Sequence, residues 1–272
     1  MTRPILFLSD YGLADEFVGV CHAVMARIAP GSPIVDLAHE IPPQDIPRGA
    51  AVLAQAARHG PRDGVYLAIV DPGVGTERRP VAIEAGDALL VGPDNGVLST
   101  AWTELGGVKR AFMISAPGVM LDKVSPTFHG RDVFSPCAAH LSQGLSLDEV
   151  GEEIDPGTLV EVTLPGARIE PGYVHCKVIG VDRFGNIQLS ARPTDLAEAG
   201  IPSGEEIHVR AGGNGYDVPV RATFAQVEEG EGVVVADSSG FLTLAKNRRH
   251  AAEELGIHVG DHVVLCPRMP EA

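Results

Sequence analysis

The chain has 272 residues, of which 44% are hydrophobic and 21% charged, so it can bury the core of one large domain or two modest ones. Its 36 acidic residues outnumber its 21 lysines and arginines, which gives a formal net charge of −15. A nucleic-acid surface needs a basic patch, and anionic membranes attract positive charge. We therefore expect neither partner, whereas a neutral or cationic small ligand fits this charge.

The cysteines and the amino-terminal segment bear on where the protein works. The four cysteines lie far apart and form no CxxC pair: Cys21, Cys137, Cys176 and Cys266. Isolated thiols of this kind are typical of a reducing compartment. The apolar run at residues 5–8 is too short for a signal peptide, and no stretch approaches the roughly 20 apolar residues of a membrane span. We therefore expect a cytoplasmic protein.

The first half of the chain alternates between strand-like and helix-like patterns. The strand-like runs are residues 5–8, 34–37 and 65–70, and the helix-like segments are residues 17–28 and 49–58. Such alternation predicts a parallel sheet with helices packed on it. We expect a Rossmann-like α/β domain over residues 1–164.

Short strand-like runs and glycine-rich turns dominate the rest of the chain. The runs are residues 173–181, 207–211, 233–236, 241–244 and 262–265. One helix is expected over residues 194–199 with Thr194 as its cap, and the proline- and glycine-rich residues 164–172 are expected to be a linker. The rhythm predicts a smaller C-terminal β-barrel or sandwich over residues 165–272.

The run DPGVGTERR at residues 71–79 directly follows the third predicted strand. Ligands bind at the ends of strands in open α/β sheets. Asp71 stands at such an end, in a loop with two glycines, and Arg78 and Arg79 follow closely. This pattern indicates a site in which a charged carboxylate can orient water. The alternative is a salt bridge that only stabilises the loop.

Three further polar positions in this half have more than one interpretation. Asp10 ends the first strand, where an acid can bind a ribose diol, cap a turn or bind a metal. The run PDNG at residues 93–96 predicts a plain tight turn. His129 lies before a helical run, where a structural role is the commoner one, although histidine is the side chain most easily used near neutral pH.

The second half has two ambiguous loops. Asp182, Phe184 and Asn186 lie between predicted strands, so a hairpin turn is the simplest interpretation, but an exposed phenylalanine beside an asparagine could also stack on a base and hydrogen-bond to it. Ser238 lies in a similar loop. The chain has no P-loop, GxGxxG, HExxH or GxSxG motif and no Cys/His cluster with zinc spacing. We therefore expect no metal and no cofactor.

Six runs together resemble one family across nearly the whole chain: SDYG, DPGVGTERR, PDNG, TFHGRD, DRFGN and SSGFLTLAKN. The family is the S-adenosylmethionine (SAM) hydroxide adenosyltransferases, relatives of the fluorinase and chlorinase enzymes. The resemblance implies an N-terminal α/β domain, a C-terminal β-barrel and a homotrimer with active sites between subunits. It also implies SAM as the small-molecule substrate, with no separate cofactor, and adenosine that can co-purify with the protein.

The resemblance further implies hydrolysis of SAM to adenosine and L-methionine, with water displacing methionine at the ribose C5′. The implied catalytic triad is Asp71, Arg78 and His129, and Asp10 matches the acid that binds the ribose hydroxyls. The other implied contacts are Phe184, Asn186 and Phe224 for adenine, and Asp15, Asp182 and Ser238 for the methionine amine and carboxylate. Because Ser239 stands where the fluorinase has an arginine, carboxylate binding must differ there.

The family's halogenating members differ at the nucleophile site. They carry a tyrosine and a threonine where this chain has Asp71 and Val74, and a halide-binding serine where it has Gly130. A carboxylate repels a halide ion but can accept a proton from water, so we expect hydrolysis. The alternatives are a chlorinase-like, halide-dependent adenosyltransferase and a non-catalytic nucleoside- or SAM-binding protein, against which the intact triad counts. A metal-dependent phosphatase built on Asp10 lacks a second acid two residues on.

For the hydrolysis, we expect Asp71 and His129 to accept hydrogen bonds from the attacking water. Arg78 is expected to fix Asp71 and to stabilise the hydroxide-like charge that develops. Holding the water in line with the C–S bond is the main task left to the protein, since the sulfonium makes neutral methionine a good leaving group.

Overall fold

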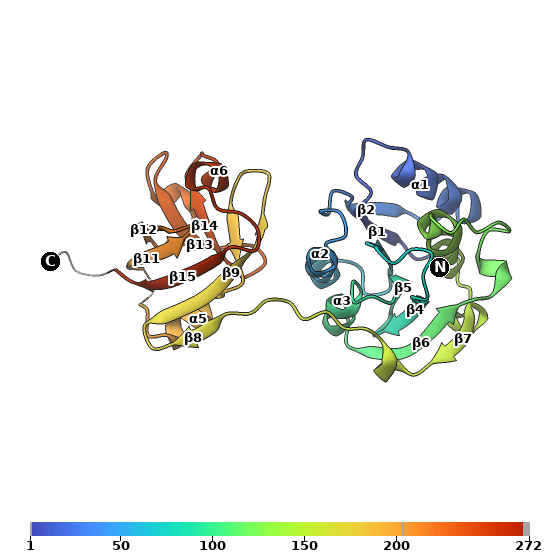
Figure 1. Cartoon of the computed structure of the whole chain (residues 1–272). Coiled ribbons are helices and arrows are strands. Elements are labelled where there is room, and N and C mark those ends of the chain that lie inside the picture. The colour runs from blue at the N-terminus through green and yellow to red at the C-terminus, as the bar shows by residue number, and fades with distance from the viewer. Residues whose placement is uncertain (1, 203, 269–272) are drawn as a thin grey trace. The chain divides into compact units, whose positions relative to one another are not determined.

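The computed structural model describes residues 2–202 and 204–268, and the chain divides into two compact units, residues 1–164 and 165–272 (Figure 1). Within the described residues, no helix combines the length and the apolar character that a membrane crossing requires.

A mixed sheet forms the first unit, and its strands lie in the order β2-β1-β3-β5-β4-β6-β7. Their bounds are β1 Ile5–Ser9, β2 Ile34–Ala38, β3 Val65–Ile69, β4 Pro80–Ala85, β5 Ala88–Pro93, β6 Val108–Ile114 and β7 Gly151–Ile154. The pairs β1–β2, β1–β3 and β3–β5 are parallel, as the alternation predicts. The prediction of a wholly parallel sheet is wrong for the other half, because β4 and β5 form a hairpin and β6 and β7 continue antiparallel.

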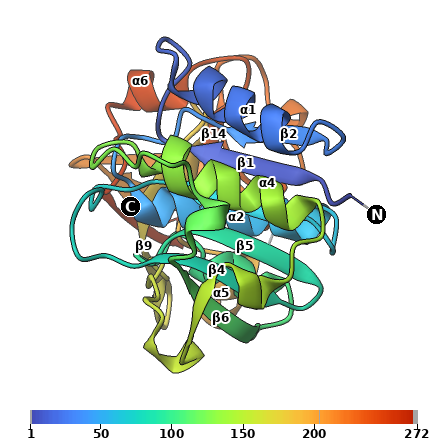
Figure 2. The same ribbon diagram turned by 90° about the vertical axis from the view of Figure 1, so that its right-hand side faces the viewer.

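Helices cover both faces of this sheet (Figure 2). They are α1 Phe17–Ile28, α2 Ile46–His59, α3 Ser99–Glu104 and α4 Ser135–Ser142, with a π-helical turn Gly130–Phe134 before α4 and short 3₁₀ turns at Pro117–Val119, Leu147–Glu149 and Pro156–Thr158. Successive residues of β1 face opposite sides: Phe7 packs in the core with α1 and α4, and Leu8 in the core with α2 and α3.

The second unit is an antiparallel sheet that nearly closes into a barrel, as the sequence predicts. Its strands are β8 Arg168–Glu170, β9 Tyr173–Val181, β10 Ile187–Leu189, β11 Glu206–Ala211, β12 Asn214–Pro219, β13 Gly232–Ala236, β14 Leu242–Lys246 and β15 His262–Pro267. They lie in the order β12-β11-β15-β9-β10-β14-β13, with β8 beside β9. An isolated β-bridge joins Val220, which directly follows β12, to Val234 of β13, and so connects the two ends of this strand order.

Two local expectations for this unit are wrong. The expected linker contains β8, which pairs with β9, so only its first residues are free of regular structure. Helix α5 (Pro193–Glu198) begins one residue before Thr194, and its first turn is closed by Asp195, whose side chain accepts a hydrogen bond from the Arg192 backbone N–H at 2.7 Å. The remaining helical elements are α6 Ala251–Leu255 and a 3₁₀ turn at Phe224–Gln226.

Candidate active site

The candidate site lies at the carboxyl ends of β1 and β3, which are adjacent and parallel, with Ser9 opposite Ile69. From β1 the chain first crosses to β2 on one side and then to β3 on the other, so the strand order reverses here. Ligands of open α/β sheets bind at such a switch point. Asp10 and Asp71 follow these two strands, so the fold brings two predicted site residues to one edge of the sheet.

The loop that carries Asp71 has a backbone that needs glycine. Gly75 adopts a φ of +78°, and a Cβ built there would lie 2.4 Å from the carbonyl oxygen of Pro126. The Thr76 hydroxyl donates a hydrogen bond to the Gly73 carbonyl at 2.7 Å, which closes a turn before Arg78. Glycine at position 75 therefore allows the loop to lie against the segment that leads to His129.

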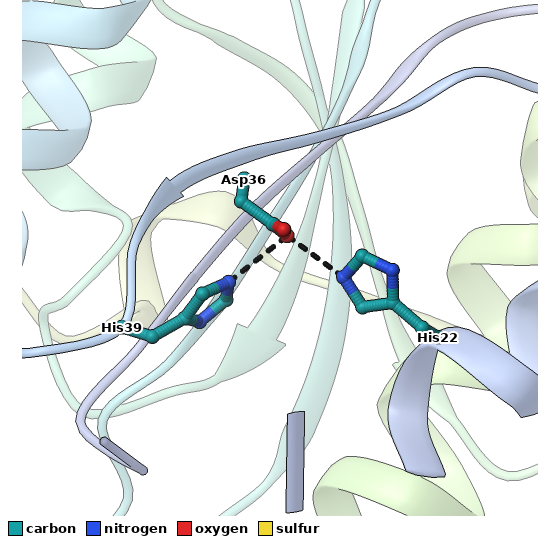
Figure 3. A group of neighbouring side chains, drawn as sticks. All are labelled: His22, Asp36 and His39. Carbon is teal, nitrogen blue, oxygen red and sulfur yellow. Dashed lines mark hydrogen bonds and ion pairs between the residues drawn. The ribbon is translucent and has the colours of Figure 1, made fainter. Parts of the chain in front are cut away.

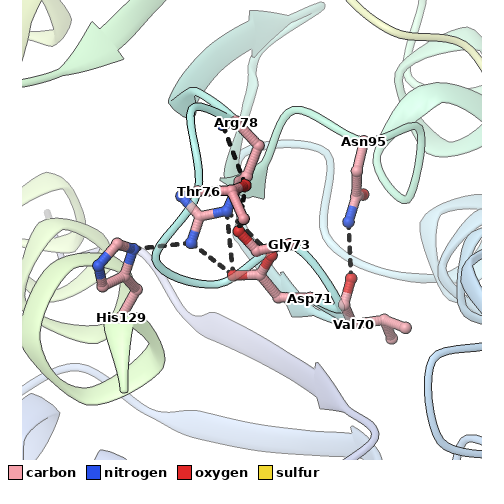
Figure 4. A network of polar contacts seen from close by, with 7 residues as sticks. All are labelled: Val70, Asp71, Gly73, Thr76, Arg78, Asn95 and His129. Atoms are coloured by element: carbon pink, nitrogen blue, oxygen red, sulfur yellow. Dashed lines mark hydrogen bonds and ion pairs between the residues drawn. The ribbon is translucent and has the colours of Figure 1, made fainter. Parts of the chain in front are cut away.

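Asp71, Arg78 and His129 form one hydrogen-bonded network (Figure 4). Arg78 Nε lies 2.9 Å from Asp71 Oδ1, and Arg78 Nη2 lies 2.5 Å from Asp71 Oδ2 and 2.8 Å from His129 Nδ1. The side chains of Asp71 and Arg78 are only 6% and 9% exposed. The guanidinium thus lies between the carboxylate and the imidazole, and a charge-assisted bidentate pair of this kind fixes geometry as well as charge.

The network determines the tautomer of His129. A guanidinium has only donors, so Nδ1 must accept the hydrogen bond from Arg78, and the proton of the neutral ring resides on Nε2. Burial lowers the pKa of His129, the nearby Arg78 charge lowers it further, and Asp71 and Asp132 act against these effects. His129 is therefore neutral near pH 7 with Nε2–H as a donor, which departs from the expectation that it accepts a hydrogen bond from water.

Arg78 and Arg79 have different surroundings. Arg78 lies over the Phe134 ring, 5.0 Å from its centroid, and its buried Nη1 has no hydrogen-bond partner among the described residues. Arg79 instead pairs with Asp94 and reaches the Thr158 carbonyl. Arg78 is therefore the guanidinium that belongs to the site, and Nη1 is its remaining donor.

Asn95 supports the site, although its motif predicts only a turn. Its side-chain amide donates to the carbonyl of Val70, the residue before Asp71, at 2.8 Å (Figure 4). Its Oδ1 accepts from the Val97 backbone N–H at 3.2 Å. Asn95 thereby links the chain after β5 to the end of β3. Its position after a neighbouring parallel strand is the signal that could have suggested this role.

Asp10 is held against the same edge. Its Oδ2 accepts a hydrogen bond from the Gln44 backbone N–H at 2.9 Å, and Gln44 has a φ of +67°. Burial raises the pKa of Asp10, the Gln44 hydrogen bond lowers it in part, and the charge of Asp71 contributes a smaller increase. The two acids therefore influence each other electrostatically. Asp15 is exposed, just before α1.

Tyr11 is a neighbour of the triad that sequence reasoning missed. A Cβ built on Gly130 would lie 2.0 Å from the Tyr11 hydroxyl oxygen, so this hydroxyl occupies the space that a side chain at position 130 would need. The Tyr11 ring packs against Phe17 and Phe128, with centroids 5.7 Å away in both cases. Burial raises the pKa of Tyr11. The hydroxyl is therefore neutral at every physiological pH.

Apart from Asp15, the predicted adenine and methionine residues belong to the second unit, where three of them share the β9–β10 loop. Asp182 Oδ1 accepts hydrogen bonds from the backbone N–H groups of Phe184 and Asn186, both at 2.9 Å, and Oδ2 accepts from Asn186 Nδ2 at 2.7 Å. Phe184 is 70% exposed. The turn interpretation thus describes the backbone, while the phenyl ring remains available for stacking.

Ser238 and Phe224 lie elsewhere in this unit. Ser238 is in the loop between β13 and β14, and Phe224, which is 40% exposed, opens a 3₁₀ turn. Sequence reasoning also missed Arg192 beside the Ser238 loop, whose guanidinium donates to the Gly240 carbonyl at 3.3 Å and lies 4.1 Å from the Phe241 ring centroid.

The sequence matches family models over most of its length. The N-terminal domain of the SAM hydroxide adenosyltransferases matches residues 5–151, and their C-terminal domain matches residues 176–264. With an α/β unit that carries an acid–guanidinium–imidazole network and a nearly closed β-barrel unit, the chain belongs to the SAM hydroxide adenosyltransferase family.

Its relatives include both branches of this superfamily. The chain is 45% identical to the (R)-S-adenosyl-L-methionine hydrolase of Salinispora tropica, covering 96% of this chain and 97% of the relative, and 43% identical to that of Thermus thermophilus, covering 97% and 99%. A fluorinase from Actinopolyspora mzabensis is 29% identical, covering 95% and 96%. A crystal structure of a conserved Thermotoga maritima protein superposes with a TM-score of 0.89 at 34% identity, covering 96% and 99%.

We predict that His129 titrates below its ordinary pKa of about 6.5. Burial and the Arg78 charge disfavour the imidazolium, so this group stabilises the fold above pH 6.5 and loses that contribution as pH falls through its lowered pKa. NMR titration of the ring protons, assigned by comparison with His129→Gln, measures the midpoint. Arg78→Gln should raise the midpoint, and a wild-type value at or above 6.5 would contradict the assigned network.

We predict that Gly130→Ala lowers the free energy of unfolding by about 1–3 kcal/mol, because the new methyl group would overlap the Tyr11 hydroxyl. Tyr11→Phe removes that oxygen, so Gly130→Ala should cost less in the Tyr11→Phe background, as a double-mutant cycle by urea unfolding measures. Gly118→Ala is the matched control, since nothing lies within 4 Å of a Cβ there. Equal costs in both backgrounds would rule out the proposed contact.

Proposed function

We propose that the protein hydrolyses SAM to adenosine and L-methionine, with a water molecule attacking the ribose C5′ in line with the C–S bond. The observation that carries this proposal is the Asp71–Arg78–His129 network at the switch point of the sheet, in a chain that belongs to the SAM hydroxide adenosyltransferase family. Because relatives at 42–45% identity are named (R)-S-adenosyl-L-methionine hydrolases, we propose the (R) sulfonium epimer as the preferred substrate.

The nucleophile pocket favours water over a halide ion. Asp71 places a carboxylate that is only 6% exposed at the site, and such a charge would repel chloride or fluoride. A serine at position 130, where halogenating relatives have one, would overlap the Tyr11 hydroxyl. Both features support hydrolysis over halide-dependent transfer.

We assign complementary roles to Asp71 and His129. Asp71 accepts a hydrogen bond from the attacking water, and His129 Nε2–H donates one to the water oxygen, which leaves one lone pair free to attack C5′. As the C–O bond forms, the C–S bond breaks and its electrons leave with methionine sulfur. The protonated product oxygen is then strongly acidic, so even a weak base such as an arginine-paired aspartate can take its proton.

Arg78 keeps Asp71 in position during this reaction. Its Nε and Nη2 donors remain on the carboxylate, so the carboxylate oxygens stay oriented toward the water while the C–O bond forms.

The remaining candidates are proposed as substrate contacts. Asp10 would accept hydrogen bonds from the ribose hydroxyls, and Phe184, Asn186 and Phe224 would hold adenine. Asp15, Asp182 and Ser238 would hold the methionine amine and carboxylate. Because the oxygens of Asp182 already accept three hydrogen bonds, its main role is to shape the loop that presents Phe184 and Asn186. Arg192 contacts the Ser238 loop through the Gly240 carbonyl and would compensate for the serine at position 239.

Assembly and location rest on the resemblance and on the thiols. We propose a homotrimer with no cofactor, because this is what the family resemblance implies. We also propose a cytoplasmic location, since all four cysteines are free and buried.

The experiment that tests the function is hydrolysis of resolved (R)- and (S)-SAM in ¹⁸O-water, with chloride present or absent. We expect adenosine labelled at the 5′-hydroxyl, equimolar methionine and no 5′-chloro-5′-deoxyadenosine, with faster turnover of the (R) epimer. Unlabelled adenosine would exclude direct attack by water. Adenosine binding without methionine release would favour a non-catalytic binding protein.

We predict that Asp71→Asn lowers turnover by at least about a hundredfold, since it removes the acceptor for the water proton, while adenosine binding persists. Asp94→Asn is the matched control, because it also removes a buried carboxylate from an arginine pair, that of Arg79, outside the triad. Steady-state kinetics and adenosine titration measure both variants. Unchanged turnover in Asp71→Asn, or an equal loss in Asp94→Asn, would remove Asp71 from the mechanism.

A further inference from the structure

His22, Asp36 and His39 form a cluster that the proposed reaction does not use (Figure 3). His22 Nε2 and His39 Nε2 lie 2.7 Å and 2.9 Å from the same oxygen, Asp36 Oδ1. Within residues 2–202 and 204–268, it is the one group of three or more His, Cys, Asp or Glu side chains whose ligand atoms all lie within 4.8 Å of one another. Both rings thus direct a nitrogen at the same carboxylate oxygen.

The fold assembles these residues from separate elements. His22 lies on α1, Asp36 on β2 and His39 directly after β2. Asp36 pairs in register with Phe7 of β1, and the register shifts by one residue immediately afterwards. The separations of 14 and 3 residues match no short metal motif, which is why the sequence predicted no metal site.

The two imidazoles are held in place by their surroundings. The buried Phe7 ring packs against both, with centroids 4.6 Å from His39 and 5.9 Å from His22. The His39 side chain is 3% exposed, and its Nδ1 lies 2.8 Å from the hydroxyl of the fully buried Ser9. A partner on the second ring nitrogen is typical of metal-binding histidines, because it fixes the tautomer that leaves the other nitrogen free.

We propose that His22, Asp36 and His39 bind a divalent transition-metal ion of the Zn²⁺ type. Two imidazoles and a carboxylate suit such an ion. An ion about 2.1 Å from each ligand needs the ligand atoms about 3 to 3.5 Å apart, so the partly exposed Asp36 carboxylate, now 2.7 Å and 2.9 Å from the two nitrogens, must turn aside to admit the ion between them. His39 would donate Nδ1–H to the Ser9 oxygen. The side chains of His22 and Asp36 are 31% and 49% exposed, which gives the ion access and leaves room for water ligands.

The ion would stabilise the turn that carries Asp10. Ser9, which contacts His39, directly precedes Asp10, and the Gly12 backbone N–H donates to the His39 carbonyl at 2.7 Å. A metal ion at the cluster would therefore tie α1 and β2 to the end of β1. This role is structural, and the ion would take no part in the chemical step of the hydrolysis.

The competing explanation is a metal-free network in which Asp36 accepts hydrogen bonds from both rings. Asp36→Asn and His22→Gln distinguish the two, because each removes a metal ligand from a partly exposed position and keeps the size of the side chain. His208→Gln is the matched control: His208 Nδ1 lies 2.6 Å from Asp217 Oδ1 with side chains 30% and 42% exposed, but no third ligand joins this pair in the part of the chain that the structure describes.

The test titrates Zn²⁺ into the untagged full-length protein by calorimetry and records the visible spectrum with Co²⁺. We expect one site per chain, d–d absorption of low-coordinate Co²⁺, and a Zn²⁺ affinity that falls at least about tenfold in Asp36→Asn and His22→Gln but not in His208→Gln. Zn²⁺ should also raise the thermal midpoint of the wild type and the control more than that of the two ligand variants. Absence of saturable binding at micromolar Zn²⁺, or equal affinity in all variants, would overturn the proposal.

Discussion

The charge-assisted pair between Asp71 and Arg78 is the interaction on which the rest of the site depends. The sheet brings two acids, Asp10 and Asp71, to the ends of adjacent strands, and each disfavours the charge of the other. A buried carboxylate without a partner is costly. Arg78 compensates Asp71 with two donors and still directs Nη2 at His129. One guanidinium therefore determines a carboxylate position, a histidine tautomer and the local charge balance together.

This pair requires a backbone that few residues allow. Gly75 must be glycine both for its positive φ and for its approach to Pro126, and this approach joins the Asp71 loop to the segment that ends at His129. Asn95 holds the Val70 carbonyl from the other side. Residues that the sequence suggests only as turn formers therefore determine the distances between the side chains of the triad. A substitution at Gly75 would displace the groups proposed to be catalytic without changing any of them.

Local patterns in the sequence predicted the parts of this molecule that depend on neighbours in the chain. They indicated the strand that ends at Asp71, the α/β and β-rich halves and an ion pair in the loop, because apolar periodicity and turn chemistry are local. They did not indicate the antiparallel half of the first sheet, the Tyr11–Gly130 contact or the tautomer of His129. Each of these depends on which distant segments meet, as for Gly130, where only the folded chain reveals the hydroxyl that fills its side-chain space.

Strand β1 connects the proposed metal site of the first unit with the proposed ribose-binding residue, Asp10. Phe7 packs beneath the imidazoles of His22 and His39, Ser9 contacts His39, and Asp10 reaches the edge where Asp71 lies. Ser9 is the buried last residue of β1 and Asp10 directly follows it, so Ser9 cannot shift in this close-packed strand without moving Asp10. An ion that fixes His39 would therefore also restrict Asp10, through the Ser9 hydroxyl and the peptide between Ser9 and Asp10. The triad is anchored on β3 and on the loop before α4, so its geometry would not change. The fold thus separates the groups proposed to hold the ribose from those proposed to hold the water.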